Sequence, residues 1–474
     1  MLKNNIVFRN ASIYILLAFI QKSISFFLVP LYTALLSPSA FGIVNQTIAL
    51  GSIYILIITY ALDEAAARFY FQYRKNQQKP VVLGSIITFS IGLSILGGII
   101  LISFNKFLFR VFIPELPISF IVLSVLIIMS SPIYSIFQKI LRIKEAAKSY
   151  TFLMLGYSIT QIILSVLFLV VIKLNALGYI LAISITSVIF GSYSFYKLRK
   201  EIKIVISKTV LVAVLKYATA IVPHTISGWG IKGYTTVVIG KIINSAAVGI
   251  FNAVNFISVI IDVLSKAILD AYQPWVYRIL EKETESYKKI ITATRLLGLL
   301  FVLLGFILSL LAPEILQILI NKQYHSGISI TPFLIFSSVT LVLGSLVIYV
   351  LYYKRENTKY ISFATIIGAF INIVLCALLI PKYNIFGAAI SLASSNLVIS
   401  ILKQIFASKA LKARALFIDV YFLAISNLFI SYYAISFEIT IFQKIIIFTT
   451  ECLLLLLFYF KKIYSLIKLI NNKL

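Results

Sequence analysis

Charge is scarce in this sequence. Only 12% of its 474 residues are Asp, Glu, Lys or Arg, whereas a soluble domain has about 25%. Hydrophobic residues make up 61% of the chain, so the surface of a soluble globular protein cannot be built from this composition. The apolar residues form continuous runs of roughly 20, which predict membrane-spanning helices. A barrel is excluded, because its strands would alternate apolar and polar residues.

Cysteine and histidine are almost absent. The two cysteines, Cys376 and Cys452, lie inside apolar runs, which excludes a disulfide framework. Neither cysteine has the spacing of a metal ligand, and His224 and His325 are the only histidines. The sequence also lacks a recognisable nucleophile–base pair, carboxylate dyad or metal cluster. We therefore predict no cofactor, no metal site and no enzymatic activity.

Acidic residues are few as well, 15 against 42 Lys and Arg, which leaves a net charge of +27. A basic balance can indicate nucleic-acid binding. Here the basic residues lie in short loops between apolar runs, which indicates membrane topology and anionic lipid instead. With the N-terminus inside, thirty of them fall on the inner side and six on the outer side. The fourteen apolar segments are 12–36, 42–62, 81–104, 118–138, 151–172, 177–196, 210–240, 248–270, 291–312, 328–352, 360–380, 385–402, 416–435 and 442–460.

A short motif occurs twice. The turn Ser37–Asn45 reads Ser-Pro-Ser-Ala-Phe-Gly-Ile-Val-Asn, and Ser245–Asn252 reads Ser-Ala-Ala-Val-Gly-Ile-Phe-Asn. Other matches follow at nearly the same separation. The matched positions are Gly42 with Gly249, Asp63 with Asp270, Lys144-Glu145 with Arg355-Glu356, Lys173 with Lys382, Asn175 with Asn384, and Gly178 with Gly387. A separation near 207 residues predicts one six-helix lobe built twice.

Six spans is an even number, so both copies have the same orientation and form a parallel repeat. We predict an all-α integral membrane protein of about fourteen transmembrane helices. The lobes are 1–207, with spans 1–6, and 208–410, with spans 7–12, and residues 411–474 add spans 13 and 14. Two such lobes around a central cavity are typical of an alternating-access transporter, with the substrate between them.

Three stretches carry a family resemblance. They are the turn Ser37–Asn45, Lys382-Tyr-Asn-Ile-Phe-Gly-Ala-Ala at 382–389, and Asp63-Glu-Ala-Ala-Ala-Arg68 after the second span. In order and spacing the chain resembles the polysaccharide biosynthesis and O-antigen repeat-unit flippases of the MOP (multidrug/oligosaccharidyl-lipid/polysaccharide) exporter superfamily. That family is similar in fold to multidrug antiporters and the lipid II flippase. One position departs from it, because Ala34 stands where many members carry a basic residue, whereas the second copy has Lys241.

Basic residues within the spans mark candidate binding positions, because an ionisable group in the bilayer costs several kcal/mol. Lys22 lies deep in the first span, and Lys232 and Lys266 lie in the seventh and eighth. Lys216 is near the inner end of the seventh span, where snorkelling explains it equally well. The resemblance implies that Arg68 meets substrate phosphate at the inner mouth. Together these cations favour an anionic head group.

Two further groups are candidates for ion or proton coupling. Asp262 lies one turn before Lys266, so the two either form a structural ion pair or take part in coupling. His224 either carries a proton or is a hydrogen-bonded packing residue. In the last span, Lys444 and Glu451 lie seven residues apart on one face, which predicts a structural pair.

Candidate bending points lie in the first and seventh spans, where proline and glycine weaken a helix. The alternative for the glycines is close helix packing. Gly228-Trp-Gly-Ile-Lys-Gly233 matches a dinucleotide-binding pattern but follows no strand, so we reject that interpretation. The candidate positions are Pro30, Pro223, Gly228, Gly230 and Gly233.

The resemblance implies a flippase. Its substrate would be a polyprenyl-pyrophosphate-linked oligosaccharide repeat unit, moved from the cytoplasmic to the outer leaflet for O-antigen, capsule or exopolysaccharide assembly. A cation-coupled multidrug antiporter of the same superfold stays open, although nothing acidic in the first lobe lies deeper than Asp63 and Glu64. A membrane enzyme acting on lipid-linked glycans is less favoured.

The same resemblance implies a location and partners. We expect a monomer in the bacterial plasma (inner) membrane with both termini cytoplasmic. Its expected partners are the lipid-linked substrate, membrane lipids, a polysaccharide polymerase and chain-length machinery. We expect no binding of nucleic acid.

Overall fold

The computed structural model describes residues 28–73, 77–114, 116–281, 287–353, 357–411 and 417–455. Helices are the only regular secondary structure in these ranges, as the sequence predicted. Eleven helical stretches are long and apolar enough to cross a membrane. One of them, α15 (Thr358–Leu411), contains two predicted spans that meet at a kink. Twelve of the fourteen predicted spans are therefore accounted for, and the first and last lie partly outside the described ranges.

Backbone packing divides the chain into two compact units, Met1–Asn252 (unit 1) and Ala253–Leu474 (unit 2). The sequence predicted lobes of 1–207 and 208–410. The observed division shows that the helix after residue 207 packs with unit 1. It does not test where one copy of the repeat ends, so the lobe boundaries stay a prediction.

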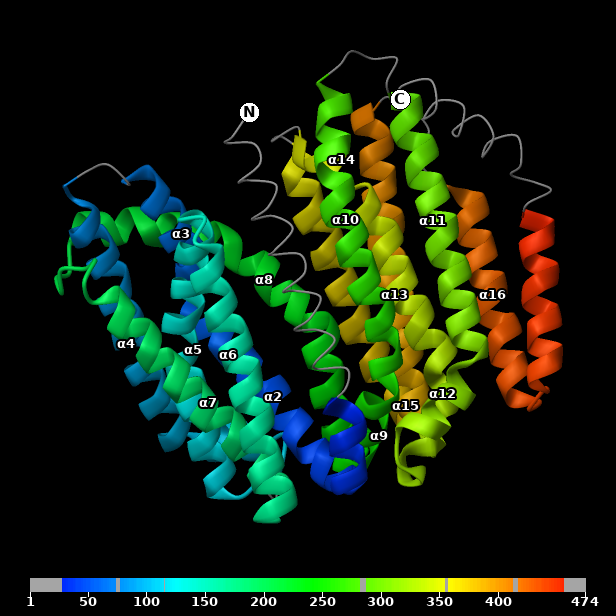
Figure 1. Cartoon of the computed structure of the whole chain (residues 1–474), viewed down its shortest axis with the longest axis horizontal. Coiled ribbons are helices and arrows are strands. Elements are labelled where there is room, and N and C mark those ends of the chain that lie inside the picture. Colours follow the sequence, from blue (N-terminus) through cyan, green and yellow to red (C-terminus); the bar gives the residue numbers. More distant parts are fainter. Residues whose placement is uncertain are drawn as a thin grey trace. The chain divides into compact units, whose positions relative to one another are not determined.

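Unit 1 is built around one central helix (Figure 1). That helix, α5, packs against α2, α3, α4 and α7. Two apolar clusters fill the unit, one around Leu83 and Ile140 and the other around Ile121 and Ile128. The helices are α2 (Pro38–Thr59), α3 (Leu62–Gln72), α4 (Lys79–Ser103), α5 (Ile118–Ile143), α6 (Ala147–Val166), α7 (Asn175–Leu198) and α8 (Lys208–Ile242), with short π-helices at Lys106–Arg110 and Leu167–Val171.

Unit 2 also has a central helix, α13, which is almost entirely buried and packs against α10, α11, α15 and α16. Along the chain, unit 2 begins within α9 (Ser245–Asn255), which crosses the division between the units. Its elements are the 3-10 helix η3 (Phe256–Ser258), α10 (Val259–Leu280), α11 (Tyr287–Leu310), α12 (Ala312–Leu319), the 3-10 helix η5 (Lys322–Ile330), α13 (Thr331–Leu346), α14 (Ile348–Tyr353), α15, α16 (Ile418–Ser436) and a last helix at 441–455.

The backbone repeats where the sequence does. Asn175 and Asn384, which the repeat pairs, both have a left-handed φ, of 53° and 52°. At Asn384 the ψ is −137°, so the helical backbone is interrupted there. Three positions later, Gly178 and Gly387 each face a backbone carbonyl of the preceding segment, at Phe168 and Leu379 respectively. A tight corner of the same kind thus recurs in both copies.

The two copies of the opening motif form helix starts. Ser37 Oγ accepts a hydrogen bond from Ala40 N at 3.2 Å and caps α2, and Pro38 occupies its first turn. Asn244 Oδ1 accepts one from Ala247 N at 2.9 Å and caps α9 in the same way. The segment interpreted from sequence as a turn is therefore a capped helix N-terminus.

These two helix starts touch each other through their glycines. A Cβ on Gly42 would lie 1.6 Å from the carbonyl oxygen of Ser245 and 2.9 Å from the nitrogen of Gly249. A Cβ on Gly249 would lie 2.0 Å from the carbonyl oxygen of Pro38 and 3.1 Å from the nitrogen of Gly42. The two contacts are equivalent, because Ser245 follows Pro38 by 207 residues and Gly249 follows Gly42 by the same number. A local two-fold axis therefore passes between the two glycines.

Candidate functional site

The candidate site in unit 1 is built on α8. This helix packs against α2, α3 and α4, and Figure 1 shows it changing direction partway along its length. Pro223 is its interior proline, which removes a backbone hydrogen bond and bends a helix. The indole of Trp229 holds α8 to α2, because Nε1 donates to Ala49 O at 2.9 Å and to Ser52 Oγ at 3.0 Å.

Two of the glycines predicted as bending points have different surroundings. A Cβ on Gly233 would lie 2.2 Å from Nε1 of Trp229, so this glycine leaves room for the indole. A Cβ on Gly228 would meet nothing within 4 Å. Close packing therefore accounts for Gly233, whereas Gly230 is buried within α8. Pro30 lies in the helical stretch 28–35, and bending at these positions stays a prediction.

The first half of α8 lies beside α3. Tyr60 and Ala61 both adopt left-handed φ values, of 48° and 53°, which end α2 and start α3 in a new direction. The hydroxyl of Tyr60 lies 2.9 Å from Thr219 Oγ1 on α8. The guanidinium carbon of Arg68 lies 4.4 Å from the ring centroid of Tyr217, also on α8. This cation–π contact holds the exposed Arg68 at the surface that α3 and α8 share.

The acidic residues of α3 are engaged by α5. Ser135 Oγ donates to Asp63 Oδ2 at 2.7 Å, and Lys139 forms an ion pair with Glu64. Arg68 instead stacks on Tyr217, and the exposed Lys216 is the neighbour of that tyrosine on α8. The contact between α3 and α8 therefore carries the cation of Arg68, while Asp63 and Glu64 have their partners on α5.

A second basic cluster, absent from the sequence-based candidates, joins the start of α4 to the segments that follow α5 and α7. Lys79 Nζ donates to Glu201 Oε2 at 3.2 Å and to Tyr70 OH at 3.2 Å. Lys144 pairs with the other carboxylate oxygen of Glu201. Burial alone would raise the pKa of the Glu201 carboxyl, but the hydrogen bonds and charges of Lys144 and Lys79 outweigh burial and lower it. The cluster keeps one net positive charge.

The lowered pKa of Glu201 predicts a pH dependence. Its contribution to stability is present above the pKa of an unfolded-state glutamate and is lost as the pH falls through the lower, folded-state pKa. The unfolding midpoint temperature of Glu201→Gln is therefore expected to vary less with pH below the unfolded-state pKa than that of the wild type. Thermal unfolding in detergent across that acidic range tests this. Parallel profiles for the two proteins would contradict it.

The other sequence-predicted residues are spread along the chain. Lys22 lies outside the described residues. Lys232 is exposed on α8, and His224 is half-buried one residue after Pro223. Asp262 and Lys266 lie one turn apart on α10, half-buried and exposed respectively. Arg68 lies at the contact between α3 and α8, and Lys216 is exposed on α8. The binding and coupling roles of all these residues stay predictions.

The predicted pair in the last helix is wrong. Lys444 Nζ donates to Glu314 Oε1 on α12 at 2.6 Å. Glu451 accepts a hydrogen bond from Asn427 Nδ2 on α16 at 2.8 Å. The face of the last helix that carries both residues packs onto other elements, so each residue has a partner outside its own helix.

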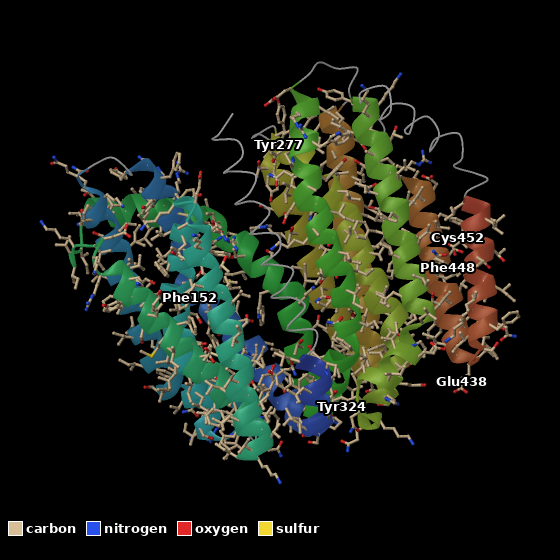
Figure 2. All side chains as sticks on the ribbon, in the orientation of Figure 1. Phe152, Tyr277, Tyr324, Glu438, Phe448 and Cys452 are labelled. Carbon is tan, nitrogen blue, oxygen red and sulfur yellow. The ribbon has the colours of Figure 1, made fainter. Side chains whose placement is uncertain are left out.

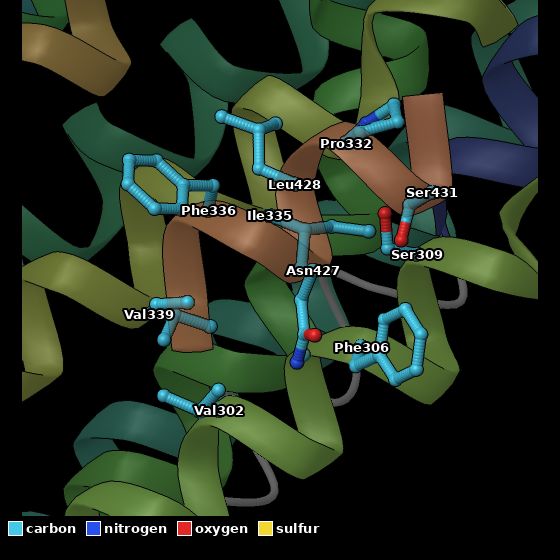
Figure 3. Close-up of a pocket in the computed structure, with 12 residues that line it drawn as sticks. Val302, Phe306, Ser309, Pro332, Ile335, Phe336, Val339, Asn427, Leu428 and Ser431 are labelled. Carbon is cyan, nitrogen blue, oxygen red and sulfur yellow. The ribbon is translucent and has the colours of Figure 1, made fainter. Parts of the chain in front are cut away.

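A small cavity with a mostly apolar lining lies inside unit 2, between α11, α13 and α16 (Figure 3). Its lining is apolar except for Ser309, Asn427 and Ser431. The two hydroxyl oxygens and Asn427 Oδ1 are buried and form no hydrogen bond with the described residues. The space open to a water-sized sphere is about 20 Å³. It has room for about one water molecule, so it is too small for a lipid head group.

Sequence comparison identifies related proteins. Residues 7–280 match the family described as "Polysaccharide biosynthesis protein". A Haemophilus influenzae protein described as "Uncharacterized membrane protein" is 25% identical over 376 residues, which are 77% of this chain and 88% of that protein.

Structural comparison identifies the fold. The lipid II flippase MurJ in an inward closed conformation superposes with a TM-score of 0.71 at 13% identity, over 98% of this chain and 99% of MurJ. An inward-facing MATE family multidrug resistance transporter of the MOP superfamily gives a TM-score of 0.62 at 14% identity, over 82% of this chain and 94% of the transporter. At these identities the likeness shows a shared fold.

Proposed function

The chain belongs to the polysaccharide biosynthesis protein family and has the MOP superfamily fold, and on that premise we propose that it flips lipid-linked oligosaccharide repeat units. The substrate is a polyprenyl-pyrophosphate-linked oligosaccharide, carried from the cytoplasmic to the outer leaflet for O-antigen, capsule or exopolysaccharide assembly. The lipid tail stays in the bilayer while the charged head group crosses through the protein. The chain works as a monomer in the bacterial plasma membrane, with both termini cytoplasmic.

The observation that carries this proposal is the charge arrangement around α3. On α5, Lys139 balances the charge of Glu64, and the hydroxyl of Ser135 donates a hydrogen bond to Asp63. Arg68 is exposed at the contact between α3 and α8, and Lys216 is exposed on α8. An arginine can bind phosphate oxygens through two parallel hydrogen bonds, and a lysine supplies a point charge. This surface therefore favours a pyrophosphate head group.

Three further cations are assigned to the same ligand. Lys232 lies on α8 about four turns beyond Lys216, and we assign it, with Lys22 and Lys266, to contacts with the anionic head group, because each is a charge within an apolar run. Pro223, where we expect α8 to bend, lies between Lys216 and Lys232. Flexing at this bend would alter access from one cation to the next. His224 and Asp262 are the groups that we assign to coupling.

A multidrug antiporter is the second candidate, favoured by the fold shared with the MATE transporter. Between α4 and α7 the sequence has only two acidic residues, Glu115 and Glu145. Glu145 follows the end of α5, and Glu115 lies outside the described residues. A cationic drug would therefore meet few opposite charges in this unit. Restored drug efflux in a pump-deficient strain would favour the antiporter over the flippase.

Replacing Arg68 with alanine is expected to reduce translocation of a lipid-linked oligosaccharide about ten-fold, because a hydrogen bond to a charged group contributes roughly 1.5 kcal/mol. The measurement is the rate at which substrate becomes accessible to an outside enzyme in proteoliposomes. Arg68→Lys retains the charge and is expected to lose less.

Arg199 provides a matched control. It is also exposed, and its guanidinium carbon lies 4.0 Å from the ring centroid of Tyr196, so it makes the same kind of contact outside the α3–α8 surface. Arg199→Ala is expected to translocate like the wild type. Equal rates for Arg68→Ala and wild type, or equal losses in both alanine variants, would contradict the role of Arg68.

A further inference from the structure

A second, larger pocket opens at the end of unit 2 that the loop charges place outside. It has a volume of about 420 Å³, within the range of about 300–1,000 Å³ found for small-molecule sites. Four segments meet around it: α12, η5, the end of α16 and the start of the last helix. Figure 2 shows Glu438 and Tyr324 at this end of the unit. Its polar lining is Glu314, Gln317, His325, Ser329, Glu438 and Lys444.

A buried ion pair anchors this pocket. The side chain of Lys444 is only 4% exposed, and its Nζ donates to Glu314 Oε1 at 2.6 Å. The other carboxylate oxygen, Oε2, is buried and accepts no hydrogen bond from the described residues. A buried acceptor of this kind is stabilised by a hydrogen-bond donor. The pocket therefore offers a charged acceptor for a ligand hydroxyl or amide.

The imidazole of His325 is oriented by the backbone. Its Nε2 lies 3.1 Å from the carbonyl oxygen of Ile320. A carbonyl only accepts, so Nε2 carries the proton in this contact and Nδ1 of the neutral ring is an acceptor. Gln317 and Ser329 are exposed and add groups that can both donate and accept. Acceptors therefore outnumber donors around the pocket.

Glu438 occupies a backbone position that favours glycine. Its φ is 49°. The bonds Glu438 N→Ile435 O (3.3 Å) and Ile439 N→Ala434 O (3.2 Å) close a Schellman motif at the end of α16, with Glu438 at the position where glycine is usual. A side chain in this region is strained. Glu438 lines the pocket and adds a second carboxylate to it.

We propose that this pocket is a saccharide subsite, which binds an uncharged sugar of the head group at the outer end of unit 2. Two carboxylates, one already balanced by Lys444, disfavour an anionic ligand, while the surplus of acceptors suits hydroxyl groups. Pro313, Ile328, Ile435 and Ile439 supply apolar surface for the ring faces. The inference rests on the proposed function, because it takes a sugar from the substrate class proposed for the chain.

Saturation-transfer NMR on the purified protein in nanodiscs tests the subsite. The probes are free neutral hexoses, 6-deoxyhexoses, N-acetylhexosamines, hexuronates and, as a cation, spermidine. At least one neutral sugar is expected to bind saturably, with hexuronates binding at least several-fold more weakly. Glu314→Gln is expected to weaken that binding about ten-fold, since it removes the charge from the buried acceptor.

Glu438→Gly keeps the test decisive if Glu314→Gln fails to fold. Glycine relieves the left-handed backbone, so this variant is expected to unfold at the same or a higher temperature than the wild type and yet to bind the sugar several-fold more weakly. Glu145→Gly is the matched control, because Glu145 is exposed with a φ of 55° in unit 1. It is expected to leave sugar binding unchanged.

Three results would overturn the subsite: no neutral sugar binds, Glu438→Gly binds as well as the wild type, or spermidine binds more tightly than every sugar. The translocation assay separates this inference from the proposed function. Translocation without sugar binding at this pocket removes the subsite alone. Sugar binding here without translocation of any lipid-linked oligosaccharide removes the proposed function and leaves the pocket.

Discussion

Gly42→Ala is expected to lower the free energy of unfolding by about 3 kcal/mol, the upper end of the usual range for overpacking. The added methyl would lie 1.6 Å from the carbonyl oxygen of Ser245, so one helix start must move away from the other. Because the obstacle is backbone, no side chain can rotate to make room. Gly249→Ala is expected to have a similar effect, since its methyl would lie 2.0 Å from Pro38 O. Thermal unfolding of the detergent-solubilised variants measures both.

Gly51 is the control on the same helix. A Cβ at this position meets nothing within 4 Å. Alanine is also favoured over glycine by about 1 kcal/mol inside a helix. Gly51→Ala is therefore expected to unfold at or above the wild-type temperature. If Gly42→Ala and Gly51→Ala unfolded at the same temperature, the close contact between the two helix starts would be refuted.

Glu314→Ala is expected to lower the free energy of unfolding by about 3–5 kcal/mol, the loss typical of removing one partner from a buried ion pair. The variant leaves the ammonium group of Lys444, on a side chain 4% exposed, without its carboxylate. The loss comes from the charge left behind as much as from the missing hydrogen bond. Unfolding in a denaturant series, followed by tryptophan fluorescence, measures it.

The double variant Glu314→Gln with Lys444→Met separates these causes. It removes both charges and keeps side chains of similar size, and such replacements are often nearly neutral. We expect it to recover more than half of the stability lost in Glu314→Ala. A double variant as unstable as Glu314→Ala would show that Lys444 is not buried as a charge beside Glu314.

The sequence predicted the features that depend on runs of apolar residues and on the separation between repeated residues. Continuous apolar runs located the spans, because a bilayer sets their length. The repeat paired Asn175 with Asn384, and both residues have a positive φ in the structure. It also paired Gly42 with Gly249, although nothing in the sequence indicated that the two glycines touch.

Partners across helices were not predictable from spacing. Lys444 and Glu451 share a helix face, but each bonds to a different element, because the packing partner of that face is set by the tertiary fold. Glu201 is engaged by Lys79 and Lys144, which come from two other segments. Its place in a run of basic residues gave no indication of either partner.

The candidate site was predicted in part. The basic residues of the seventh span were identified because charge is rare in apolar runs, and Arg68 because of the family resemblance. The contact of Arg68 with Tyr217 and the turning of Asp63 and Glu64 toward α5 depend on the break at Tyr60 and Ala61. Two consecutive left-handed residues that are not glycine leave no pattern that sequence alone reveals.

The contact between Gly42 and Gly249 has the symmetry of a dimer contact. Equivalent residues that face each other across a two-fold axis form an isologous interface, the kind that joins two identical subunits. Here both sides of such an interface lie in one chain. Each glycine is the other's partner within a single molecule, so a bulkier residue at either position would have to be accommodated by both helix starts.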